Sequence, residues 1–129
     1  MLGDQELALP AGRQAAGLAR RFLRQVLIDL QDHTTDLILL LATELVANAV
    51  LHGAPPISLH VTIDVTAGTL RISVNDTSDT AVVLPAHGWS DQAEGGRGLL
   101  LIDALATAWG SEPQGNGLGK STWFEVLAA

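Results

Sequence analysis

Apolar and polar residues alternate along two consecutive segments in the middle of the chain. Every second residue from Ile57 to Thr66 is Ile, Leu or Val, and the alternation resumes from Leu70 to Asn75 after the dipeptide Ala67-Gly68. Because successive side chains of a strand point to opposite faces, this period of two predicts two strands with one buried face. The short connection is typical of a tight turn and predicts an antiparallel hairpin.

Two segments before this hairpin follow the helical period instead. From Ala11 to Leu30 the apolar residues recur at helical spacing while the arginines lie mostly on the other face, which predicts an amphipathic helix. From Asp36 to Gly53 the chain is mainly Leu, Ala, Val and Ile, and it ends on a glycine before two prolines. This second segment predicts a largely buried helix with a C-terminal cap.

The remaining pattern predicts three more strands and one more helix. The strands are expected over Gln5–Leu9, at an edge, and over Trp109–Glu112 and Ser121–Leu127; the helix is expected to follow the glycine-rich turn Gly95–Gly98. The long connection Thr77–Glu94 has no useful period, which is typical of a lid or a disordered loop. The order predicts a single domain over residues 1–129 of the α+β class, a two-layer α/β sandwich with helices on one face of a mixed or antiparallel sheet.

Composition narrows the classes of protein that fit this pattern. The chain has 129 residues, 47% of them apolar and 16% charged, which is enough for one domain with its own core. It contains no cysteine, which excludes a disulfide framework and a thiolate metal site, and its net charge of −7 argues against direct nucleic-acid binding. The acidic start and the short charge-free run Leu37–Thr43 indicate neither a signal peptide nor a membrane span, so a cytoplasmic protein is expected.

Three polar residues interrupt the apolar helix predicted over Asp36–Gly53. Glu44, Asn48 and His52 are spaced by four, so they lie on one stripe of that helix. A buried carboxylate and amide are costly unless something pairs with them, so either the fold satisfies them as a structural pair or a ligand does. We favour the ligand, because an Asn oxygen suits Mg²⁺ and a Glu one turn earlier can act on a hydroxyl beside a terminal phosphate.

Two glycine-rich stretches are candidates for holding that phosphate. The glycines of Gly95–Gly98 would let the backbone approach an anion at a helix start, where the first N–H groups are unpaired and Arg97 adds charge. The stretch Gly117–Ser121 fails as a P-loop, because its glycine spacing is one residue off and a strand rather than a helix follows it. Asp76, at the end of the second hairpin strand, could accept a hydrogen bond from an exocyclic amine such as that of adenine.

Four segments of the chain resemble the motifs of the histidine-kinase-like ATP-binding superfamily (GHKL, or Bergerat fold), which includes gyrase B, Hsp90 and MutL, and they occur in the same order as in that superfamily. Glu44–Gly53 is similar to its N box and Val74–Ser78 to its adenine-binding Asp motif. Gly95–Leu99 is similar to the second glycine box and Gly119–Phe124 to the final glycine-Thr strand. The chain most resembles the anti-sigma factor serine/threonine kinases and the stand-alone ATP-binding regulators of actinobacteria.

This resemblance implies ATP and Mg²⁺ as cofactors and assigns roles by position. Asn48 would bind Mg²⁺, Glu44 would be the general base, and Asp76 and Thr122 would lie at the adenine. The remaining nucleotide-binding residues would contact the phosphates: Gly95, Gly96, Arg97, Gly98 and Leu99. The chain departs from the family where the usual Asp-x-Gly-x-Gly reads Asp-Thr-Ser-Asp-Thr, a sequence that lets the backbone approach a nucleotide less easily.

Two functions therefore remain open. The first is an ATP-dependent serine/threonine kinase that phosphorylates an anti-sigma-factor antagonist and sequesters a sigma factor; the intact Glu44 favours it. The second is a module that holds ATP, or nothing, and regulates by docking a protein partner; the missing glycines favour it. The catalytic fragment of a sensor kinase is disfavoured, because no dimerisation helix pair or phospho-acceptor segment is recognisable. A homodimer is a further expectation, since dimers are common in the resembled family.

Overall fold

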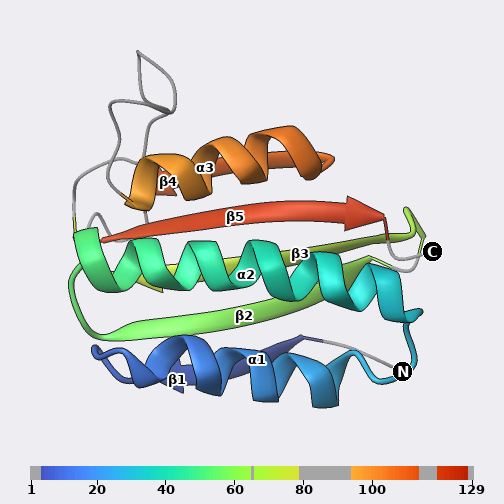
Figure 1. Ribbon diagram of the computed structural model, residues 1–129, viewed down its shortest axis with the longest axis horizontal. Helices are drawn as coiled ribbons and strands as arrows, with labels where there is room; N and C mark the ends of the chain where they lie inside the picture. The colour runs from blue at the N-terminus through green and yellow to red at the C-terminus, as the bar shows by residue number, and fades with distance from the viewer. Residues whose placement is uncertain (1–3, 65, 79–93, 114–118, 128–129) are drawn as a thin grey trace.

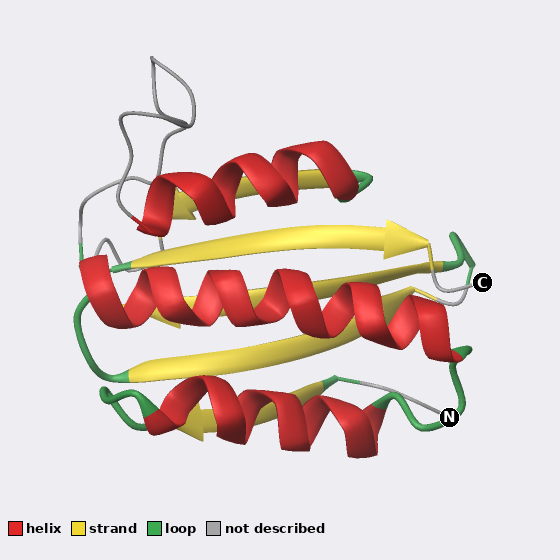
Figure 2. Ribbon diagram, in the orientation of Figure 1, coloured by secondary structure: helices red, strands yellow, loops and turns green. Residues whose placement is uncertain are grey.

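In the part of the chain that the structure describes, a five-stranded sheet carries three helices on one face (Figures 1 and 2). The computed structural model describes residues 4–64, 66–78, 94–113 and 119–127, and within 94–99 it describes the backbone alone. In chain order the elements are β1 (Gln5–Leu9), α1 (Gln14–Val26), α2 (Asp32–His52), β2 (Ile57–Asp64), β3 (Thr69–Asp76), α3 (Glu94–Leu105), β4 (Ala108–Pro113) and β5 (Lys120–Leu127).

The strands lie in the order β1-β2-β3-β5-β4, and every neighbouring pair is antiparallel. The predicted two-layer α+β architecture is therefore confirmed, and of the two sheet types that the sequence left open the antiparallel one is observed. The hairpin of β2 and β3 and the edge position of β1 are also as expected. The last strand, β5, lies between β3 and β4, so that β3 has a partner from the far end of the chain.

The core lies between α2 and the centre of the sheet. Alternate residues of β3 and β5 are buried on the side that the helices cover, and Ile72 and Phe124, which face each other in register, have no exposed surface. From α2 the fully buried side chains include Ile38 and Leu41. Each such side chain contributes about 1.5–3 kcal/mol on burial, so this layer fixes how α2 is placed against β3 and β5.

The observed α2 is longer and more apolar than an average helix. It begins at Asp32, four residues before the predicted start, because its polar first turn is helical too, and an acidic residue there suits the helix dipole. By length and composition this 21-residue helix could cross a membrane, since a window of 18 residues within it has a mean hydropathy of 1.6. Half of that window is buried inside the fold, where α2 packs against α1, α3 and the sheet, and this position accounts for its apolar character.

Two other predicted boundaries are wrong in informative ways. The first helix ends at Val26 rather than Leu30. The predicted turn Gly95–Gly98 is part of α3, which already begins at Glu94, so the glycines occupy the first helical turn instead of preceding it. The first N–H groups of a helix have no partner inside the helix, so glycine costs little at this end.

Several elements end or begin at one end of the sheet. The last residue of β3, Asp76, pairs in register with the first residue of β5, Lys120. Gly53, directly after α2, lies against the Asp76 side chain, and α3 begins at the end of the molecule where α2 ends (Figure 1). We refer to this region as the Asp76 end of the sheet.

Candidate functional site

Buried polar residues are few in this fold and they gather in one region. Five polar or charged residues are buried in the described part of the chain, namely Thr34, Asn48, Asp76, Lys120 and Thr122. All except Thr34 belong to α2, β3 or β5 at or near the Asp76 end. Burying polar groups costs free energy unless they find partners, so the partners of these four residues indicate what the region is built to do.

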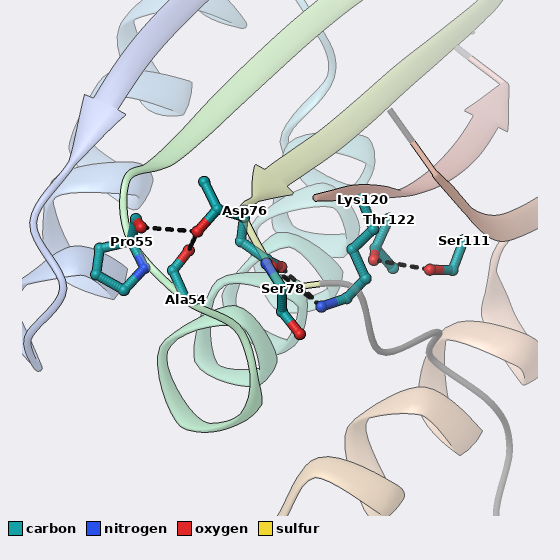
Figure 3. A network of polar contacts seen from close by, with 8 residues as sticks. Ala54, Pro55, Asp76, Ser78, Ser111, Lys120 and Thr122 are labelled. Atoms are coloured by element: carbon teal, nitrogen blue, oxygen red, sulfur yellow. Dashed lines mark hydrogen bonds and ion pairs between the residues drawn. The ribbon is translucent and has the colours of Figure 1, made fainter. Parts of the chain in front are cut away.

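The Asp76 carboxylate is held by a buried ion pair. Its side chain is 2% exposed and that of Lys120 is 6% exposed, and the Nζ of Lys120 lies 3.0 Å from Oδ2 and 3.1 Å from Oδ1 (Figure 3). The backbone N–H of Ser78 donates a second hydrogen bond of 2.7 Å to Oδ1. The carboxylate is therefore satisfied within the protein, by a cation from the neighbouring strand and by its own following loop.

Backbone packs closely around this carboxylate. A Cβ placed on Gly53 would lie 2.6 Å from Asp76 Cγ and Oδ2, and one placed on Gly119 would overlap the Asp76 carbonyl oxygen. Gly119 also has a φ of +97°, a conformation that favours glycine. Thr77 links the end of β3 to the segment after α2, since its N–H donates to the Ala54 carbonyl at 2.9 Å and its hydroxyl donates to the Pro55 carbonyl at 2.8 Å.

Thr122 lies on the same face of the sheet as the ion pair. It follows Lys120 by two residues on β5, which places both side chains on the side of the helices. Its Oγ1 is 3.3 Å from the Oγ of Ser111 on β4, and either hydroxyl can be the donor (Figure 3). The structure thus brings Asp76 and Thr122, both predicted to lie at an adenine, to one face and one end of the sheet.

The polar stripe of α2 differs in exposure along its length. Asn48 is buried, Glu44 is half-buried, and His52 is exposed. Asn48 is only 8% exposed, although it carries a carboxamide on a largely apolar helix. Asn48 precedes Gly53 by five residues, about 7.5 Å along a helix, and Glu44 lies one turn further back. A carboxamide so little exposed, on the stripe of α2 that leads to Gly53, lies where a ligand at the Asp76 end could contact it.

The predicted phosphate-binding stretch Gly95–Leu99 is described in its backbone alone. The backbone of Gly95, Gly96, Arg97, Gly98 and Leu99 forms the start of α3, at the end of the molecule where α2 ends (Figure 1). The side chains of Arg97 and Leu99 lie outside the described residues, and so does most of the predicted lid, residues 79–93. The expectation of an anion site at this helix start therefore stays a prediction.

Lys120 is the residue of this region that the sequence analysis missed. It lies in the stretch that fails as a P-loop and in the segment Gly119–Phe124 that resembles the final glycine-Thr strand, but neither pattern gives it a role. Two signals were available: it is the only lysine of the chain, and it shares its parity on β5 with the inward-facing residues Thr122 and Phe124. A lysine on the buried parity of a strand indicates a buried anion near it.

A polar hollow is present on the face of the sheet without helices. It is lined by Thr62, Asp64, Thr69, Arg71 and Glu125. Two of its charged residues already satisfy each other, because Arg71 donates to Glu125 at 2.8 and 2.9 Å, and the Arg71 guanidinium lies 3.9 Å from the centre of the Trp123 ring. This hollow lies towards the other end of β3 from Asp76, and we assign no function to it.

Comparison with known proteins identifies the family. Residues 9–119 match the family model described as histidine kinase-like ATPase domain. The chain belongs to this family. Membership implies that this histidine kinase-like ATPase domain binds ATP, in agreement with the resemblance noted in its four motifs. No curated protein sequence is significantly similar to it.

Solved structures share the fold of this ATPase domain. One is the crystal structure of the RsbU and RsbW domains of a Mycobacterium tuberculosis protein, with a TM-score of 0.71 and 23% identity over 98% of this chain and 32% of that one. Another is the histidine kinase domain of a blue-light-activated kinase from Erythrobacter litoralis, with a TM-score of 0.50 and 18% identity over 88% of this chain and 59% of that one. The ATPase domain thus spans about a third and about three fifths of these chains, and at such identities the likeness is one of fold.

Proposed function

We propose that this ATPase domain binds Mg²⁺-ATP at the Asp76 end of the sheet and acts as a serine/threonine kinase on an anti-sigma-factor antagonist. The observation that carries the proposal is the grouping of buried polar residues there, above all Asn48, which is only 8% exposed on a largely apolar helix. Burying a polar group costs stability unless it finds a partner, and a bound ligand would supply one for Asn48.

Each residue has a role in this proposal. Asp76 accepts a hydrogen bond from the exocyclic amine of adenine, with Thr122 beside it on the same face. Asn48 offers an oxygen to Mg²⁺, which prefers a few hard oxygen ligands together with substrate phosphates. The first turn of α3 would receive the phosphates through its N–H groups: Gly95, Gly96, Arg97, Gly98 and Leu99. ATP, when bound, supplies the phosphoryl group.

Glu44 supplies the chemistry in the kinase hypothesis. It lies one turn before Asn48 on α2 and is half-buried, so its carboxylate can be reached by a Ser or Thr hydroxyl of a partner. As general base it would take the proton of that hydroxyl while the hydroxyl oxygen bonds to the γ-phosphorus of ATP, the bond to the bridging oxygen breaks and ADP leaves. An antagonist of an anti-sigma factor is proposed as acceptor, and a sigma factor as the other partner. Support comes from the resemblance of the motifs and from the RsbW domain in the similar structure.

Calorimetry tests the nucleotide site. ATP is titrated with and without Mg²⁺ into the wild type, into Asn48→Ala, and into the matched control Asn75→Ala. Asn75 lies on the face of the sheet without helices and contacts His60 there, so its loss should not change binding. We expect Mg²⁺-dependent binding that only Asn48→Ala weakens, by about tenfold or more. Equal binding by all three proteins would contradict the role of Asn48.

Phosphotransfer separates the kinase from the second candidate, a non-catalytic ATP-binding or partner-docking module. The missing glycines after Asp76 favour this second candidate, because they leave the backbone less able to approach the nucleotide. Transfer of labelled γ-phosphate to anti-sigma-factor antagonists should fall by a factor of about 100 or more in Glu44→Ala, while its ATP binding stays near the wild-type value. Transfer at the wild-type rate would refute the general base, and no transfer by the wild type would favour the docking module.

A further inference from the structure

The carboxylate proposed to accept the adenine amine is already engaged by a cation of the protein itself. Lys120 Nζ lies within 3.1 Å of both oxygens of Asp76, and both side chains are almost completely buried. We propose that Lys120 is a gate on the base-binding carboxylate, which a nucleotide reaches only when the ammonium group withdraws. This inference rests on the proposed function. It adds a residue that controls the affinity of the site for nucleotides and its selectivity among them.

The surroundings of Asp76 leave Lys120 as the neighbour that can move. On the Oδ2 side Gly53 packs so closely that a Cβ there would come within 2.6 Å, and the obstacle is backbone. On the Oδ1 side the Ser78 N–H donates at 2.7 Å, which is again a backbone group. Lys120 reaches the carboxylate through a flexible four-carbon stem, so its ammonium can leave without moving a strand.

Withdrawal of the ammonium makes the site selective for bases with an amine. Lys120 brings a full positive charge to the Asp76 carboxylate, whereas a base amine is neutral, so the amine only partly replaces the interaction that Lys120 gave. ATP should therefore bind more weakly than it would to an open carboxylate. A base with a carbonyl in place of the amine, as in inosine triphosphate, offers no donor there and would face the carboxylate with an oxygen.

The test compares two nucleotides on matched variants by calorimetry. Lys120→Met removes the ammonium and keeps the stem, Lys120→Arg keeps the charge, and Arg71→Met removes a cation from the other face of the sheet as control. We expect ATP to bind Lys120→Met at least about tenfold more tightly than the wild type, while the affinity for inosine triphosphate is unchanged. Lys120→Arg and Arg71→Met should bind ATP as the wild type does.

The outcomes separate this inference from the proposed function. If Lys120→Met binds ATP no better than the wild type, or less well, the gate is refuted. The adenine role of Asp76 still stands in that case if Asp76→Asn, made in the wild-type protein, weakens ATP binding. If Lys120→Met gains equally for both nucleotides, the ammonium does not act on the base and the gate is refuted as well. If neither the wild type nor Lys120→Met binds ATP at millimolar concentration, both proposals are wrong.

A measurement on the unaltered protein covers the case in which Lys120→Met does not fold. Because Lys120 is the only lysine of the chain, ¹³C-labelled lysine gives a single side-chain ε signal in an NMR spectrum. Asp76→Asn supplies the reference position for a lysine that lacks its carboxylate. Saturating ATP should move the wild-type signal towards that reference, and a signal that ATP leaves in place would overturn the gate.

Discussion

The buried pair of Asp76 and Lys120 predicts a large and specific dependence of stability on both charges. Asp76→Asn leaves the Lys120 ammonium, 6% exposed, without its carboxylate, and Lys120→Met leaves the carboxylate, 2% exposed, without its cation. Breaking a buried pair from one side costs about 3–5 kcal/mol, whereas replacing both charges by neutral groups is often close to neutral. We therefore expect each single variant to lose about 3 kcal/mol and the double variant to lose less than about 2 kcal/mol.

The free energies of unfolding are measured without nucleotide, by urea titration followed through tryptophan fluorescence. The difference between the double variant and the sum of the single ones gives the coupling between the two residues, expected here at about 4 kcal/mol or more. The matched cycle uses Arg71→Met and Glu125→Gln, a pair 41% and 27% exposed with a distance of 2.8 Å. For that exposed pair we expect a coupling below about 1 kcal/mol that added salt reduces further.

Additive losses at Asp76 and Lys120 would refute this reasoning. They would mean that each residue is stabilised by other neighbours and that the two charges are not a unit. A coupling as small and as sensitive to salt as that of the exposed pair would refute it too, because it would place the pair in contact with solvent.

The glycines and the third helix give three more predictions, all measurable by urea unfolding. Gly119→Ala should lower the free energy of unfolding by at least about 2 kcal/mol more than Gly68→Ala does. Both glycines have a positive φ, but only a Cβ at Gly119 would overlap the backbone of Asp76. Equal losses in the two variants would contradict the close packing. Gly68→Ala itself should cost about 1 kcal/mol through backbone strain alone, and it should leave ATP binding unchanged. Ile102→Ala, at a fully buried position of α3, should cost about 2–5 kcal/mol, while Leu105→Ala, 45% exposed, should change stability by about 0.5 kcal/mol or less.

Local patterns were enough to predict most elements of this fold. The period of two located β2 and β3, and the helical period with its final glycine located α2, because burial of one face acts on neighbouring residues. The insertion of β5 between β3 and β4 was not predicted. Pairing between strands that are far apart in sequence depends on how whole faces pack, and no short segment carries that information.

The candidate site was predicted in its residues but not in its connections. Asn48 and Asp76 stood out as polar groups in apolar surroundings, and the structure does bury both. The ion pair with Lys120 follows only from the register of β3 with β5, which brings residues 44 positions apart into contact. Helix boundaries were off by several residues, since first turns such as that of α2 are polar and read as loops.

The antiparallel register also separates the proposed site from the point where the chain leaves the sheet. Asp76 faces Lys120 at one end of β3, and Thr69 faces Leu127 at the other, a difference of seven residues or about 24 Å. β1 runs towards the Asp76 end and starts away from it, at the level of Val61. The start of β1 and the end of β5 therefore both lie away from the proposed site. The same architecture can serve as a module inside longer multidomain chains, as it does in the two-domain mycobacterial structure, of which the match covers 32%.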